Sequence, residues 1–162
     1  MRETYTNRAV KPNIFLDICE IVHKVCKQKP GENAVGGFGL KLSEVQRLLG
    51  ATLIWGEHCL EREVATACGA DLMSDVLAFT KDGALLLTGL INPQVVRTAD
   101  VGGLSAIVFV RGKAPSPEAA AMARELDIPL FSTPHTLFQA CGILYANGLA
   151  PCPPLAGKSL EE

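Results

Sequence analysis

A short apolar run followed by a polar residue and a proline occurs three times in the second half of the chain. The pairs are Asn92-Pro93, Ser116-Pro117 and Thr133-Pro134. An Asn, Ser or Thr at a helix N-cap accepts a hydrogen bond from a free backbone N–H, and a proline in the first turn has no N–H to leave unpaired. The pattern therefore predicts a repeated series of strand, turn and helix.

The series predicts strands at 84–87, 106–110 and 129–131, each followed by a helix, at 93–100, 117–126 and 134–147. Upstream, the sequence predicts strands at 51–55 and 63–68 and a helix at 74–80. The strands are apolar on both faces, which is typical of a parallel sheet covered by helices on both sides. We therefore expect the α/β class: a single three-layer α/β/α domain with a mostly parallel sheet.

The rest of the chain predicts an appendage on either side of this domain. Residues 1–39 are expected to form an N-terminal amphipathic helix and a Gly-rich linker, residues 40–149 the α/β domain, and residues 150–162 a Pro-rich tail. Isoleucine and valine recur at helical spacing in the first segment, so its apolar face must pack on the domain or on a second copy of the chain. The chain also has 48% hydrophobic and only 20% charged residues, and exposed apolar surface is usually covered by a partner, so we expect a homodimer.

Composition excludes several classes of partner. The 15 basic and 17 acidic residues are scattered and give a net charge of -2, so we expect no nucleic-acid partner. The longest apolar runs are strand-sized, so we expect no membrane segment, and the first residues do not resemble a secretion signal. We therefore expect a cytoplasmic protein.

The six cysteines stand singly, without a Cys-x-x-Cys pair. This favours free thiols in a reducing compartment and predicts neither a structural metal nor another cofactor. His58 and Cys59 are neighbours, but adjacent side chains rarely face each other, so we interpret this segment as a turn.

A binding site is expected where parallel strands lead into helices, because these strand ends meet at one edge of the sheet. Helix N-termini carry partial positive charge, and two basic side chains add full charges, so this edge suits an anionic ligand such as a nucleotide phosphate. As alternatives, the polar residues serve only as caps and the basic pair only as a solvated turn. The candidate residues in these loops and at the starts of the helices are Ser74, Asp75, Thr88, Gly89, Asn92, Arg111, Lys113, Ser132, Thr133 and His135.

No nucleophile, acid and base assemble convincingly in the sequence, which argues against an enzyme. The alternative is a small enzyme that acts on a phosphate ester through Asp75, Thr88 and His135.

From about Leu42 to Leu149 the chain resembles a DRTGG domain, on the stretches LSEVQRLLGA, GEHCLEREV, GADLMSDVLAF, LLLTGLINPQVVRTA, AIVFVRGK and IPLFSTPHTLFQACGILYANGL. Such modules occur beside CBS domains in regulated pyrophosphatases and in phosphotransacetylases, and they resemble the N-terminal domain of HPr kinase. Small proteins of this type are associated with iron-only hydrogenase systems. The resemblance implies an α/β sandwich, often dimeric, with a regulatory or scaffold role.

The resemblance also adds Asp71 to the candidate ligand-binding residues, as the aspartate of the family pattern, and it places the threonine and first glycine at Thr88-Gly89. Leu72 and Met73 stand where the arginine is expected, and Leu90 replaces the second glycine.

Three functional hypotheses follow. The first is a non-catalytic regulatory or scaffold module that binds a small anionic ligand, such as an adenine nucleotide, or a partner protein, with a hydrogenase-related protein as one such partner. The second is a purely structural homodimerisation module, and the third is the small phosphate-ester enzyme.

Overall fold

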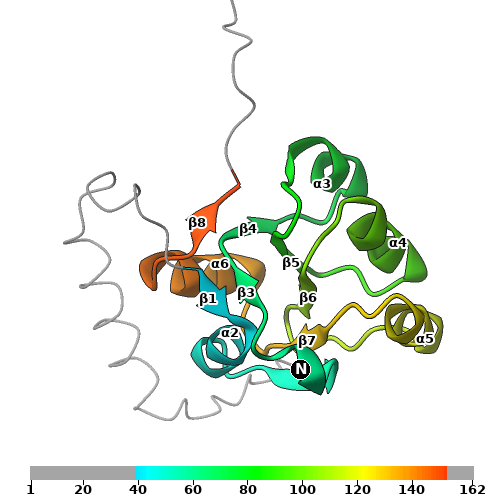
Figure 1. Cartoon of the computed structure of the whole chain (residues 1–162), viewed down its shortest axis with the longest axis horizontal. Helices are drawn as coiled ribbons and strands as arrows, with labels where there is room; N and C mark the ends of the chain where they lie inside the picture. Colours follow the sequence, from blue (N-terminus) through cyan, green and yellow to red (C-terminus); the bar gives the residue numbers. More distant parts are fainter. Residues whose placement is uncertain (1–38, 153–162) are drawn as a thin grey trace, which may run out of the picture. The chain divides into compact units, whose positions relative to one another are not determined.

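The protein, in a computed structural model, is described over residues 39–152. Within these residues six strands form one sheet in the order β2-β7-β6-β5-β4-β8, and two short strands pair as a second sheet (Figure 1). The strands are β1 (Leu40–Lys41), β2 (Thr52–Trp55), β3 (Glu63–Val64), β4 (Thr66–Gly69), β5 (Leu85–Thr88), β6 (Ala106–Phe109), β7 (Leu130–Ser132) and β8 (Ala150–Pro151). The helices are α2 (Leu42–Leu48), the 3-10 helix η1 (Glu57–Cys59), α3 (Met73–Phe79), α4 (Pro93–Val101), α5 (Pro117–Glu125) and α6 (Leu137–Ala146).

The main sheet is parallel except at one edge. Strands β8, β4, β5, β6 and β7 are parallel to one another, and β2 pairs antiparallel with β7. This confirms the predicted α/β class with a mostly parallel sheet. The predicted N-terminal helix, the linker up to residue 38 and the tail from residue 153 lie outside the described residues.

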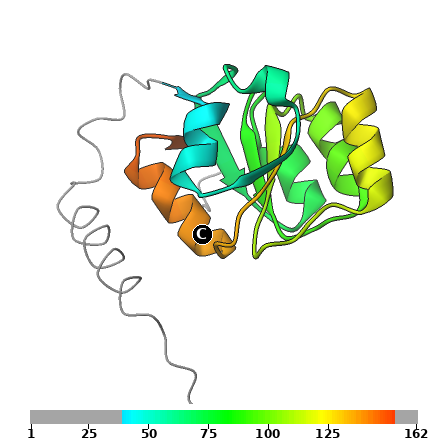
Figure 2. The same ribbon diagram turned by 90° about the horizontal axis from the view of Figure 1, so that it is seen from below.

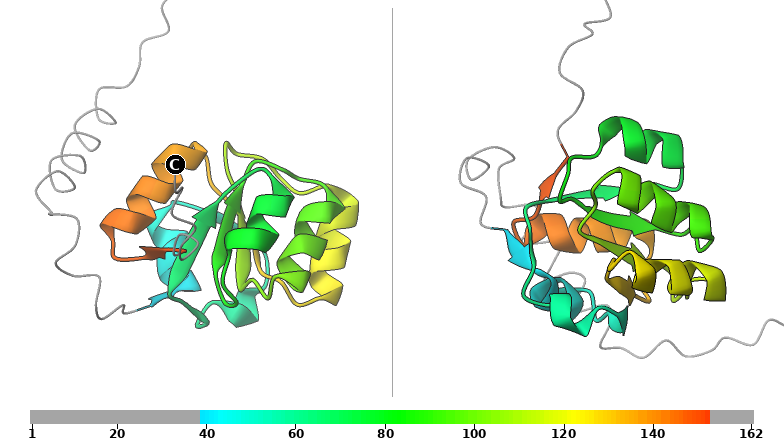
Figure 3. Two further views of the ribbon diagram at one scale, coloured as in Figure 1. Left: turned by 90° about the horizontal axis from the view of Figure 1, so that it is seen from above. Right: turned by 45° about the vertical axis from the view of Figure 1, so that its right-hand side comes forward.

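Helices cover both faces of the sheet, and the central strands β5 and β6 are therefore buried along their whole length. Leu85 and Leu87 pack in one core with residues of α2 and α6, whereas Leu86 packs in the other core with α3, α4 and α5. All three leucines are fully buried, and each such side chain stabilises the fold by roughly 1.5–3 kcal/mol. Figure 2 shows α2 and α6 on one side of the sheet and α3, α4 and α5 on the other, and Figure 3 shows the latter three side by side.

The three predicted N-caps have different outcomes. Ser116 caps α5 by accepting a hydrogen bond from the Ala119 N–H, as predicted. Asn92 occupies the N-cap of α4, but its side chain makes no capping hydrogen bond.

The prediction that Thr133 caps the last helix, and that this helix starts at residue 134, is wrong. The Thr133 side chain is fully buried and donates a hydrogen bond to the Leu49 carbonyl oxygen, 2.7 Å away. The helix begins at Leu137, with Thr136 as its cap: Thr136 accepts from the Gln139 N–H and Gln139 accepts from the Thr136 N–H. His135 therefore lies before the helix rather than in its first turn.

Two strand predictions also need correction. The extended piece predicted at 63–68 is divided into β3, which pairs with β1, and β4, which belongs to the main sheet. The segment predicted only as a Pro-rich tail begins with β8, which pairs with β4 at the edge of the sheet. An edge position tolerates Pro151 because a proline has no N–H to donate to a further strand.

None of the helices within residues 39–152 has the length and apolar character needed to span a membrane.

We expect Thr136→Ala to lower the free energy of unfolding by about 1 kcal/mol, because the first turn of α6 loses its cap. Urea denaturation followed by circular dichroism measures this loss. The matched control is Asn92→Ala, at an N-cap whose side chain makes no capping bond, and it should cost less. Equal losses in the two variants would contradict the assignment of Thr136 as the functional cap.

Candidate functional site

Polar residues from four strands meet at the edge of the sheet where the parallel strands end. Asp71 lies just beyond β4, Thr88 ends β5, Arg111 lies just beyond β6, and Ser132 ends β7. In open parallel sheets, ligands bind at this edge.

Asp71 joins the loop after β4 to the loop after β5. Its Oδ1 accepts two hydrogen bonds, from the Thr88 hydroxyl at 2.9 Å and from the Gly89 N–H at 2.6 Å. The Thr88 hydroxyl also accepts from the Leu90 N–H at 3.2 Å. Thr88 is fully buried, so its hydroxyl is used within the protein.

Two cationic side chains reach the same loop from beyond β6. The Arg111 guanidinium lies 3.5 Å from Asp71 Oδ2, and the Lys113 ammonium donates to the Gly89 carbonyl oxygen at 2.7 Å. The Arg111 side chain is 51% exposed, so it is accessible to solvent and to a ligand. These two cations and one carboxylate leave one positive charge in excess.

The turn that carries the cations is fixed by the neighbouring loop. Arg111 has a φ of 63°, in the left-handed region, and Gly112 follows with a φ of 64°. The Arg111 N–H donates to the His135 carbonyl oxygen and the Gly112 N–H to that of Thr133, at 2.7 and 2.8 Å. The Ser132 hydroxyl donates to the Lys113 carbonyl oxygen at 2.7 Å. The residues after β7 therefore hold the turn after β6 in place.

The surroundings keep Asp71 ionised. Burial by itself raises the pKa of its carboxyl group, but the Gly89 N–H, the Thr88 hydroxyl and the charges of Arg111 and Lys113 outweigh that effect. The pKa of Asp71 is therefore lower than that of an ordinary aspartate.

Gly89 allows the arginine to approach the backbone. A Cβ atom at this position would lie 1.9 Å from Arg111 Nη2 and 3.2 Å from Asp71 Oδ2. Any larger residue would displace the guanidinium from its place beside the carboxylate.

The structure brings together some of the predicted site residues and separates others. Asp71, Thr88, Gly89, Arg111 and Lys113 form one hydrogen-bonded cluster, which we call the Asp71 cluster. Ser132 and the backbone of His135 support it from β7.

Three other predicted residues do not join the Asp71 cluster, and a fourth has a structural role. Among the hydrogen bonds of the described residues, none links the side chain of Ser74, Asp75 or Asn92 to it. Thr133 is buried and bonded to Leu49, so its hydroxyl is a structural group.

Sequence reasoning missed the pairing of Arg111 with Asp71. The arginine expected next to Asp71 is replaced by Leu72 and Met73, and a cation 40 residues further along the chain stands beside the carboxylate instead. The only signal was the presence of Arg111 and Lys113 in a loop at the same edge of the sheet.

Comparison with known proteins supports the fold and the family of the chain. A solved structure of the CBS and DRTGG domains of the regulatory region of a Clostridium perfringens pyrophosphatase, complexed with its activator diadenosine tetraphosphate, is similar to this chain with a TM-score of 0.58. The sequence identity is 16%, and the alignment covers 79% of this chain and 56% of that one, so the likeness concerns the fold. No curated protein matches the chain. The family model of the DRTGG domain matches residues 44–146, well over half of the sequence. The chain therefore belongs to the DRTGG domain family.

Proposed function

We propose that this protein is a regulatory module that binds a small anionic ligand, of the nucleotide or phosphate-ester type, at the Asp71 cluster without transforming it. The observation that carries the proposal is the convergence of Arg111 and Lys113 on the loop at Gly89, with one positive charge in excess. Half-exposed guanidinium groups bind phosphate oxygens through two parallel hydrogen bonds, which gives both affinity and orientation.

The comparison supports a nucleotide as the class of ligand. The similar regulatory region was crystallised with diadenosine tetraphosphate, an activator that carries four linked phosphates between two adenosines. A phosphate chain of this kind offers several anionic oxygens to a site with two cations. We infer that an adenine nucleotide is the first ligand to test.

The arrangement does not favour the phosphate-ester enzyme. Thr88 is buried and its hydroxyl donates to Asp71, so it is not placed as a nucleophile. Among the described residues, no hydrogen bond joins the side chain of Asp75 or His135 to Thr88. A non-catalytic role fits these contacts better.

The cytoplasmic location and the hydrogenase-related partner stay predictions.

We expect Arg111→Gln to weaken binding of ATP or diadenosine tetraphosphate by about 10- to 100-fold, because a hydrogen bond to a charged group contributes roughly 1.5–3 kcal/mol. Isothermal titration calorimetry at fixed ionic strength measures the change. The matched control is Lys81→Gln, which removes an exposed cation before β5, at the opposite end of that strand, and it should leave affinity unchanged. Absence of binding heat for both nucleotides, or equal affinity of the two variants, would reject the proposal.

We expect Gly89→Ala to weaken the same binding while the protein remains folded. The added methyl group would displace the flexible end of Arg111 from Asp71, whereas the backbone at Gly89 is not left-handed and accepts an alanine. Calorimetry gives the affinity and circular dichroism the stability. Gly142→Ala in α6 is the control, because a Cβ there meets open space. Unchanged affinity in Gly89→Ala would show that the position of the guanidinium is irrelevant.

We expect the stabilising effect of Asp71 to disappear only in acid. Because its folded-state pKa is lowered, the ionised carboxylate stabilises the fold above the ordinary aspartate value of about 3.9, and this contribution is lost as the pH falls through the lower folded value. The difference in unfolding free energy between the wild type and Asp71→Asn should therefore be constant near neutral pH and shrink below about pH 4.

Urea denaturation at several pH values measures that difference. Asp75→Asn is the control, since the Asp75 side chain makes no hydrogen bond among the described residues. A gap for Asp71→Asn that stayed constant far below pH 4 would contradict the assigned role.

A second candidate function, homodimerisation, is favoured by an apolar groove of about 330 Å³ between α6, β4 and β8. Phe138 and Tyr145 line the groove and are 89% and 55% exposed. Exposed apolar patches of this kind mark interaction sites. A second copy of the chain is the occupant that the predicted homodimer requires.

If the groove is the dimer contact, Phe138→Glu should convert a dimer into a monomer, because the contact would bury an unpaired charge. Light scattering at micromolar concentration measures the mass. Val101→Glu is the control: Val101 is 75% exposed on α4, on the other side of the sheet. A wild-type monomer, or a Phe138→Glu dimer, would exclude this contact.

A further inference from the structure

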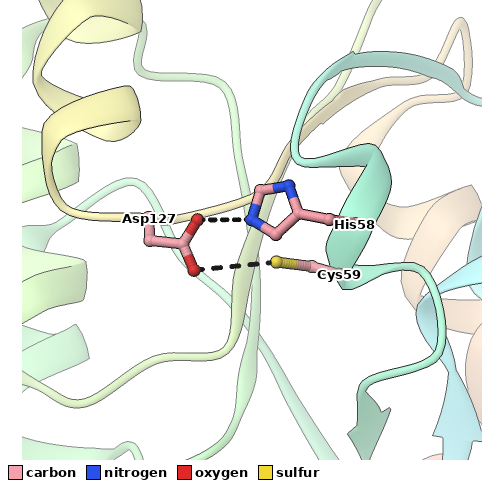
Figure 4. A group of neighbouring side chains, drawn as sticks. All are labelled: His58, Cys59 and Asp127. Atoms are coloured by element: carbon pink, nitrogen blue, oxygen red, sulfur yellow. Dashed lines mark hydrogen bonds and ion pairs between the residues drawn. The ribbon is translucent and has the colours of Figure 1, made fainter.

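A second cluster of reactive side chains lies at the other end of the parallel strands, away from the Asp71 cluster. His58 and Cys59 belong to η1, and Asp127 lies in the connection between α5 and β7. Figure 4 shows the imidazole and the thiol both directed at the two oxygens of the Asp127 carboxylate. The interpretation of His58-Cys59 as a simple turn missed this third residue.

The three side chains lie close enough together to bind one metal ion. His58 Nε2 lies 2.6 Å from Asp127 Oδ1, and Cys59 Sγ lies 3.9 Å from Asp127 Oδ2. One nitrogen, one sulfur and one oxygen all lie within 4.8 Å of one another. Tetrahedral zinc with bonds of roughly 2.0–2.3 Å places its ligand atoms about 3.3–3.7 Å apart, so shifts below about 1 Å per side chain would complete the geometry.

The backbone holds the two segments in place. Gly56, just before η1, has a φ of 96°, and a Cβ there would lie 2.8 Å from the Cα of Pro129, so the start of η1 packs closely on the connection that contains Asp127. Asp127 itself is left-handed, with a φ of 54°. Asn and Asp tolerate this conformation better than other non-glycine residues. The ligand atoms are therefore presented by a fixed scaffold.

We propose that His58, Cys59 and Asp127 form a binding site for a single transition-metal dication such as Zn²⁺, with a fourth coordination position open to water or a small ligand. Imidazole nitrogen, thiolate sulfur and carboxylate oxygen are the ligands that Zn²⁺ selects, and three protein ligands with one open position are typical of reactive rather than structural zinc. His58 and Asp127 are 57% and 55% exposed, which gives an ion access to the cluster. This inference goes beyond the proposed regulatory function and does not depend on it.

Arg62 places a positive charge beside Cys59 and Asp127. Its Nη2 donates to Cys59 Sγ at 3.2 Å and lies 3.5 Å from Asp127 Oδ2, while Nη1 donates to the Ser105 carbonyl oxygen at 3.1 Å. A bound metal ion displaces the thiol proton, and the resulting thiolate and carboxylate carry two negative charges against the one positive charge of the guanidinium.

Space for a ligand of the ion adjoins His58. Residues 53–58 line a groove of about 630 Å³. Trp55 packs edge-on against the His58 ring, with ring centres 5.8 Å apart, and this contact restricts the orientation of the imidazole. The groove therefore offers room for a small molecule beside His58.

The test uses the full chain, freed of metal and then titrated with Zn²⁺ and, separately, with Co²⁺. We expect about one Zn²⁺ per chain by competition with a chelating indicator, and a thiolate-to-cobalt charge-transfer band in the near ultraviolet. Cys59→Ser should abolish this band and weaken Zn²⁺ binding by at least about tenfold. Asp127→Asn, which keeps a residue suited to the left-handed backbone, should weaken Zn²⁺ binding while retaining the sulfur band.

Two controls separate this site from other thiols. Cys141→Ser changes a half-buried cysteine in α6 and should leave the band intact. Cys19 and Cys26 lie outside the described residues and can bind metals on their own account, so the double variant C19S/C26S must also retain the band. Failure of the wild type to bind either ion, or a band that survives Cys59→Ser and disappears in C19S/C26S, would overturn the proposal. The cluster would then be an ion pair that joins η1 to the α5–β7 connection.

Discussion

Three parallel strands, β5, β6 and β7, pair in register at the centre of the sheet, with Leu87 opposite Val108 and Phe109 opposite Ser132. Because helices cover both faces, each strand is held by two packed cores as well as by its hydrogen bonds. This register places the last residues of the three strands, Thr88, Phe109 and Ser132, side by side. The loops that follow them meet at one edge, and the connections that precede them meet at the other.

At the first of these edges, a single carboxylate connects the ends of several strands. Asp71 accepts hydrogen bonds from the loop after β5 and stands beside a guanidinium from the loop after β6, so it links three strand ends through one side chain. Gly89 leaves the space in which Arg111 reaches the carboxylate. The arginine missing beside Asp71 in the sequence is thus replaced in space by a residue from another loop. The positive charge at this edge therefore comes from residues that the fold brings together, and not from one contiguous sequence motif.

The opposite edge has a different chemistry. His58 and Cys59 follow β2, whereas Asp127 comes from the connection before β7, 69 residues after His58. No residue is shared with the Asp71 cluster, so the two sites can be altered separately.

The sequence by itself determined the α/β class, the alternation of strands and helices and the edge at which Thr88, Arg111 and Ser132 meet, because apolar runs and N-terminal proline pairs report local backbone preferences. It predicted the start of α6 three residues too early, since a buried hydrogen bond from Thr133 to Leu49 takes precedence over a local cap. Only the tertiary structure decided that β8 pairs with β4, that Arg111 stands beside Asp71, and that Asp127 faces His58 and Cys59. These contacts join residues far apart in the chain, and no local pattern encodes which distant loops the packing of two cores will bring together.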